Sequence, residues 1–254
     1  MALLLPALIA LTAGCSAAPS RSAATGSTAT VGVPAAPSSS AATVGPAPAW
    51  RALGPLSGDQ LTDVLLTAAD LPPNSTTEPA KEATPAAGPD PMADAAQRYP
   101  ACAPVLTAMS ERPGASARRW YVTGNNVLGN RTLVDVGGFT GGRSKERFEA
   151  LKAAVYGGGC TDVRVDDGRG GSVDLRVEPV PSDTPEVPAV GFRVLTPTAA
   201  VASSGGFTRV YLYAAVGDNR ILFFTGDDTV HKPALRTDLV TAQIHRLTAA
   251  ATGG

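Results

Sequence analysis

Apolar residues recur with the 3.6-residue period of an amphipathic helix in four stretches of this 254-residue chain. The first, from Gly58 to about Asp70, opens with a capping box at Ser57–Gln60 and stops before Pro72-Pro73. Two more helices are predicted over residues 99–111 and 144–156. Pro233 starts a fourth, whose buried stripe comprises Leu235, Leu239, Val240, Ile244 and Leu247.

Elsewhere apolar and polar residues alternate, a period of two that is typical of strands. The seven strand candidates are residues 118–123, 131–139, 163–165, 173–177, 190–195, 208–216 and 220–225. Turn sequences such as Gly217-Asp218-Asn219 join most neighbours as hairpins, and the hairpin within 163–177 is expected to have one solvent-exposed face. The pattern predicts an α+β domain in which helices pack against a central, mainly antiparallel sheet.

The beginning of the chain has the features of a targeting segment. Residues 2–11 are almost wholly apolar, but they are fewer than the roughly 20 residues that span a bilayer. The run ends in Ala13-Gly14-Cys15, which resembles the lipobox of bacterial lipoprotein precursors. We therefore expect residues 1–14 to be a lipoprotein signal peptide and Cys15 to carry the lipid. An ordinary secretory signal is the alternative.

The next segment has the composition of a linker. Apart from Arg21 and Trp50, residues 16–50 are all Ala, Gly, Pro, Ser, Thr or Val, which cannot bury a core. We expect residues 15–51 to form a disordered tether with an r.m.s. reach of roughly 30 Å, and residues 52–254 to form one domain. Acyl chains on Cys15 would hold that domain on the extracytoplasmic face of the cell membrane.

Charge and cysteine content narrow the possible partners. The formal net charge is -1, so neither nucleic acid nor an anionic lipid surface is indicated as a partner.

With Cys15 assigned to lipid, Cys102 and Cys160 form an even pair in an oxidising compartment, which favours a disulfide. Two free thiols or a metal-binding pair are the alternatives.

The order of elements resembles the actinobacterial sensor-domain lipoproteins, which are similar to the extracellular sensor domain of PknH-like mycobacterial receptor kinases. The resemblance covers roughly residues 55–250. It rests on the segment Leu65–Leu71, on Cys102 and Gly159-Cys160, on the strand Ile221–Thr225 and on the last helix. It implies a central sheet flanked by helices, with a cleft for an unidentified ligand.

The sequence contains no motif that indicates catalysis. There is no G-x-S-x-G elbow, S-x-x-K, P-loop or G-x-G-x-x-G. His231 and His245 lie 14 residues apart, and neither Asp227-Asp228 nor the Asp166-Asp167-Gly168 turn has the spacing of a metal site. We expect a protein without enzymatic activity, cofactor or metal.

The expected function is that of a membrane-anchored lipoprotein with a ligand-binding, sensor-like domain. The residues expected to contact a ligand lie on the less buried face of the sheet, and they are Trp120, Arg209, Tyr211 and Tyr213; alternatively, helices simply cover Tyr211 and Tyr213. The ligand would be an envelope small molecule or protein. The other function considered is a scaffold, with residues 74–92 as an exposed partner-binding loop.

Overall fold

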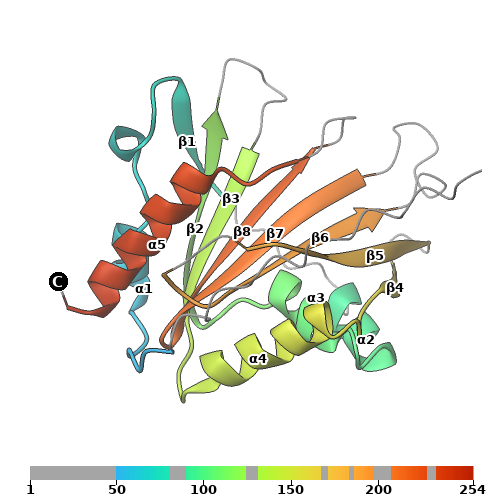
Figure 1. Ribbon diagram of the computed structural model, residues 1–254. Helices are drawn as coiled ribbons and strands as arrows, with labels where there is room; N and C mark the ends of the chain where they lie inside the picture. Colours follow the sequence, from blue (N-terminus) through green and yellow to red (C-terminus); the bar gives the residue numbers. More distant parts are fainter. Residues whose placement is uncertain are drawn as a thin grey trace, which may run out of the picture. The chain divides into compact units, whose positions relative to one another are not determined.

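One antiparallel sheet with the strand order β1-β2-β3-β8-β7-β6-β5-β4 forms the centre of this computed structural model (Figure 1). The structure describes residues 50–80, 90–123, 131–166, 171–182, 186–196, 207–227 and 233–253. The strands within these ranges are β1 Ser75–Pro79, β2 Ala115–Thr123, β3 Arg131–Gly138, β4 Asp162–Asp166, β5 Ser172–Val180, β6 Ala189–Thr196, β7 Phe207–Val216 and β8 Asn219–Asp227. The predicted α+β class is confirmed, and the seven strand candidates correspond to β2 to β8, although the candidate 131–139 extends one residue beyond the end of β3.

Helices cover both faces of the sheet. The described helices are α1 Gly58–Asp63, the 3-10 turn η1 Ala68–Asp70, α2 Pro91–Arg98, α3 Ala103–Ser110, α4 Arg143–Tyr156 and α5 Thr237–Ala251. Helices α1 and α5 pack on one face and α2, α3 and α4 on the other, as Figure 1 shows. We call these faces the α1–α5 face and the α2–α4 face.

Strand β7 is buried on both faces because it lies in the middle of the sheet between β6 and β8. Its side chains alternate: Tyr211, Tyr213 and Ala215 belong to the core on the α2–α4 face, and Leu212, Ala214 and Val216 to the core on the α1–α5 face. The expectation of a less buried face at Tyr211 and Tyr213 is therefore wrong. The exposed face expected for the hairpin of β4 and β5 is found in β4, where exposed and buried residues alternate strictly.

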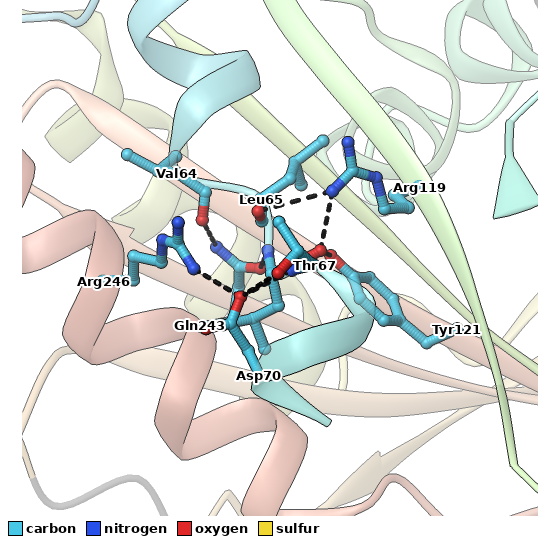
Figure 2. A network of polar contacts seen from close by, with 9 residues as sticks. Val64, Leu65, Thr67, Asp70, Arg119, Tyr121, Gln243 and Arg246 are labelled. Atoms are coloured by element: carbon cyan, nitrogen blue, oxygen red, sulfur yellow. Dashed lines mark hydrogen bonds and ion pairs between the residues drawn. The ribbon is translucent and has the colours of Figure 1, made fainter. Parts of the chain in front are cut away.

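The predicted first helix is too long. Helix α1 has the expected capping box at Ser57, but it ends at Asp63, and η1 follows only after an irregular stretch. In that stretch side chains from distant elements bind the backbone (Figure 2): Gln243 of α5 accepts from the Leu66 amide and donates to the Val64 carbonyl. Tyr121 and Arg119 of β2 donate to the Leu66 carbonyl. These bonds satisfy buried polar groups that would otherwise need helical partners.

Two further helix predictions need correction. The helix predicted over residues 99–111 corresponds to α3 alone, which is shorter. A separate helix, α2, precedes it; α2 begins at Pro91 and has Asp90 as its N-cap. The last helix begins at Thr237 rather than at Pro233. There the carboxylate of Asp238 lies in the first turn, where it interacts favourably with the helix dipole.

The exposed loop expected over residues 74–92 is only partly correct. Residues 81–89 lie outside the described ranges, but Ser75–Pro79 form the edge strand β1, paired with β2. Glu78 of β1 forms an ion pair with Arg131 of β3. Asn74, the residue before β1, has a positive φ of 66°. The strand has little buried surface, which is why its sequence has no period of two.

The predicted disulfide between Cys102 and Cys160 is confirmed, with a Cα–Cα distance of 4.6 Å. It joins the N-cap of α3 to the segment between α4 and β4, and both cysteines are buried. The bond closes a loop with a sequence separation of 58, worth about 4 kcal/mol in the chain-entropy model. It therefore fixes α3 beside the end of α4.

The predicted signal peptide, Cys15 and nearly all of the linker lie among residues 1–49, outside the described ranges. The described residues belong to one compact unit, Val44–Gly254. None of its described helices has both the length and the apolar character that crossing a membrane requires.

Candidate ligand-binding cavity

A cavity of about 470 Å³ opens between α3, α4 and the α2–α4 face of the sheet. Helix α3 and the residue after it contribute Ala103, Pro104, Thr107, Ala108 and Glu111; α4 contributes Arg143, Glu146, Arg147, Ala150 and Leu151; and Phe139, Tyr213 and Arg220 complete the lining. Small side chains on the two helices leave this space open. The cavity combines an apolar wall with a few polar groups, as small-molecule sites do.

The polar part of the cavity is built on a row of charged side chains on the sheet. In β3, Asp135 binds Arg118 of β2, its register partner, with a 2.5 Å contact. The other carboxylate oxygen of Asp135 lies 3.5 Å from Nη2 of Arg220 in β8. The side chains of Asp135 and Arg220 are only 3% and 2% exposed. Two guanidinium groups therefore share one buried carboxylate, which leaves this triad with one net positive charge.

Arg220 has unused hydrogen-bonding capacity. Its Nη2 donates to the backbone carbonyl of Glu111 at 2.9 Å, whereas its Nη1 is buried and has no partner within the described part of the chain. The guanidinium also lies 6.0 Å from the ring of Phe139. A buried donor without a partner costs about 1–3 kcal/mol, and more when it is charged. Arg220 therefore favours any acceptor that reaches it.

Tyr213 brings a second polar group to the same place. Its hydroxyl and that of Ser144 are buried and near enough to interact, but they lack the geometry of a hydrogen bond, and neither has another partner among the described residues. Burial raises the pKa of Tyr213, although Arg220, Arg147 and the Ser144 hydroxyl oppose the shift. The phenol therefore stays protonated at neutral pH and can donate.

An ion pair between Arg147 and Glu111 lies at the side of the cavity. The Arg147 guanidinium stands 4.9 Å from the centre of the Phe139 ring, within the range of a cation–π contact. The side chains of this pair are 30% and 27% exposed, far more than that of Arg220. This pair therefore lies nearer to the solvent than the buried Arg220.

The predicted ligand-contacting residues divide between two places. Tyr213 lines the cavity. The other three surround Phe224 on the same face: Trp120 meets its ring edge at 6.0 Å, Arg209 lies over it at 5.3 Å, and Tyr211 stacks on it at 5.1 Å. Phe192 stacks on the other side of Tyr211 at 5.0 Å, so that ring is part of the core. A binding role for these four residues stays a prediction.

The charged residues of the cavity were not predicted, although the sequence contains a signal for them. Asp135 interrupts the apolar run Leu133-Val134-Asp135-Val136, and Arg220 stands directly before Ile221-Leu222-Phe223. Charged residues are almost never fully buried unless they are paired. Two opposite charges in two apolar strands therefore predict a buried ion pair if the strands are neighbours, as β3 and β8 are.

Asp166 and His245, two of the candidate metal residues, have separate partners. His231, Asp228 and Asp167 lie outside the described ranges. The Nε2 atom of His245 lies 2.6 Å from a carboxylate oxygen of Glu186 on the surface, and Asp166 forms an ion pair with Arg98 at 3.1 Å. Across the residues that the structure describes, no group of three or more His, Cys, Asp or Glu side chains is placed to hold a metal ion.

The fold and cavity define an α+β domain with a helix-covered antiparallel sheet. No family model and no curated protein matches the chain. Among solved structures, it is similar to the extracellular domain of PknH from Mycobacterium tuberculosis, with a TM-score of 0.45 and 9% identity, over 79% of this chain and 98% of that one. An uncharacterized protein of Mycobacterium smegmatis, the Rv0999 ortholog, has a TM-score of 0.38 and 14% identity, over 76% and 95%.

The PknH domain is the one to which the sequence resemblance pointed. At this level of similarity neither a function nor a site carries over from one protein to the other. The cavity must therefore be interpreted from its own residues.

Proposed function

We propose that this protein is an extracytoplasmic, membrane-anchored lipoprotein whose domain binds a small molecule in the cavity between α3 and α4 and works as a sensor-like binding module. The proposal includes no catalytic step. The observation that carries it is a cavity of about 470 Å³ whose lining includes a buried arginine and a buried tyrosine with unused hydrogen-bonding groups.

The size and composition of the cavity support this proposal. Small-molecule sites are usually about 300–1,000 Å³, largely apolar, and contain a few polar groups that orient the ligand. The helix residues Ala103, Pro104, Ala108 and Leu151 supply the apolar part, and Arg220 with Tyr213 supplies the polar part. The disulfide between Cys102 and Cys160 also supports an extracytoplasmic location, because disulfides persist in oxidising compartments. The anchor on Cys15 rests on the sequence alone.

Native mass spectrometry of the full chain, purified gently from an actinobacterial cell envelope, tests the proposal. We expect a reproducible added mass on the intact, disulfide-bonded protein. Ala150→Trp fills the cavity from α4 and should abolish that mass. Ala153→Trp is the matched control, because Ala153 is an exposed alanine of the same helix that does not line the cavity. A bare mass for the unchanged protein, or an added mass that survives Ala150→Trp, would contradict ligand binding in this cavity. A bare mass would favour the scaffold function instead.

A further inference from the structure

We infer that the ligand of this cavity is an amphiphilic monocarboxylate whose carboxylate pairs with Arg220 and Tyr213 and whose apolar body lies between α3 and α4. This inference rests on the proposed function and specifies the chemistry of the same site.

The charge balance around the cavity favours an anion. Four arginines, Arg118, Arg143, Arg147 and Arg220, stand against three acidic residues, Glu111, Asp135 and Glu146. Arg147 and Glu111 neutralise each other in their ion pair. Arg143 and Glu146 of α4 also carry opposite charges, so the excess of one positive charge equals that of Arg118, Asp135 and Arg220. Asp135 and Arg220 are buried, where water screens charge poorly, and Arg118 is partly exposed. One net positive charge matches one carboxylate, whereas a doubly charged phosphate would leave an excess negative charge.

The donors also fit a carboxylate. Arg220 keeps Nη1 without a partner, and the fixed fork of a guanidinium suits the two oxygens of a carboxylate. The hydroxyl of Tyr213, from the neighbouring strand β7, can donate to the same group. Both residues are buried but line the cavity, beside the more exposed pair of Arg147 and Glu111. Because both donor atoms are buried, an anion reaches them only if that pair shifts.

The apolar part of the lining favours a ligand with an apolar body. It is formed by Ala103, Pro104 and Ala108 from α3 and by Ala150 and Leu151 from α4. These side chains offer no hydrogen bonds, so a ligand polar along its whole length would lose solvation there without compensation. The ligand class is thus an acid with one charged end and an apolar remainder.

A pair of probes of nearly equal shape tests the inference. Isothermal titration calorimetry of the full chain with its disulfide formed would compare 4-phenylbutyrate with the neutral 4-phenylbutyramide. We expect the carboxylate to bind about 10-fold more tightly or better, because hydrogen bonds to charged groups are roughly twice as strong as neutral ones. Ala150→Trp should abolish binding of both probes, and Ala153→Trp should leave both unchanged.

Variants of the two donors identify the group responsible. Arg220→Gln should remove the preference for the carboxylate, and Arg220→Lys should restore part of it. Tyr213→Phe removes a donor without changing the charge, so it keeps the inference testable if Arg220→Gln does not fold; it should weaken the carboxylate several-fold and the amide by a smaller factor, because the hydrogen bond to the charged acceptor is the stronger one. Near-ultraviolet circular dichroism would verify that each variant is folded.

The outcomes separate this inference from the proposed function. If both probes bind equally and both are lost in Ala150→Trp, the cavity binds ligands but the carboxylate inference is wrong. If neither probe binds, or if Tyr213→Phe and Arg220→Gln both keep the full preference, the inference is also wrong. Native mass spectrometry then still decides the proposed function independently.

Discussion

Replacing Gln243 by Met tests whether tertiary hydrogen bonds end the first helix. Gln243 is fully buried, accepts from the Leu66 amide at 3.2 Å and donates to the Val64 carbonyl at 2.7 Å (Figure 2). Met has a similar shape but offers neither bond, and Val64 and Leu66 are buried. Each of the two unpaired backbone groups lowers the free energy of unfolding by about 1–3 kcal/mol. The added burial of the apolar Met side chain raises it by about 1–2 kcal/mol. We expect a net loss of about 1–4 kcal/mol.

Urea denaturation followed by circular dichroism measures this change in the free energy of unfolding. Gln97→Met is the matched control, because Gln97 is an exposed glutamine of α2, and it should change stability by less than about 0.5 kcal/mol. Amide hydrogen exchange adds a local readout: the Leu66 amide should exchange faster by more than the global loss accounts for. If Gln243→Met is as stable as the control, or if the Leu66 amide keeps its relative protection, the explanation for the helix end is wrong.

Three further predictions follow from other parts of the chain. Replacing both Cys102 and Cys160 by Ser should lower the free energy of unfolding by about 4 kcal/mol in urea titrations; an unchanged value would contradict the stabilising role. Hydrogen bonds from the Thr67 backbone and side chain lower the pKa of Asp70, so its contribution to stability is present above its unfolded pKa of about 3.9 and is lost as the pH falls through the lower folded value. Asp70→Asn should therefore lose less stability than the unchanged protein between pH 5 and pH 2, and equal pH slopes would refute this. Cys15→Ser should move the protein from the membrane fraction to the soluble fraction, and retention in the membrane would contradict the lipid anchor.

The alternation of apolar and polar residues in the sequence was sufficient to place most of the strands. In β4, Val163 and Val165 are buried between exposed neighbours, so the period of two reflects real burial on one face. The same holds for the last helix, whose buried residues include the predicted Leu239, Val240, Ile244 and Leu247. The pairing of Cys102 with Cys160 was also predictable, because only one pair remained once Cys15 was assigned to lipid.

The alternation of apolar and polar residues was least informative for strands in which buried and exposed side chains do not alternate. Strand β7 is apolar on both faces, so no alternation separated an exposed face from a buried one; the structure agrees with the alternative that helices cover Tyr211 and Tyr213. Strand β1 lies at the edge of the sheet and buries little, so its sequence looked like a loop. In both cases position within the sheet, rather than local preference, determines exposure.

The sequence by itself determined the fold class, most strands and the disulfide pair, because these depend on local periodicity and composition; the lipid anchor stays a prediction. Only the tertiary structure decided where α1 ends and what lines the cavity. Gln243 lies 177 residues from the Leu66 amide that it binds, and the Glu111 carbonyl lies 109 residues from Arg220. Such contacts depend on the order of strands and the packing of helices. No local pattern encodes them, since the partners of Gln243 and Arg220 are backbone groups, which every residue has.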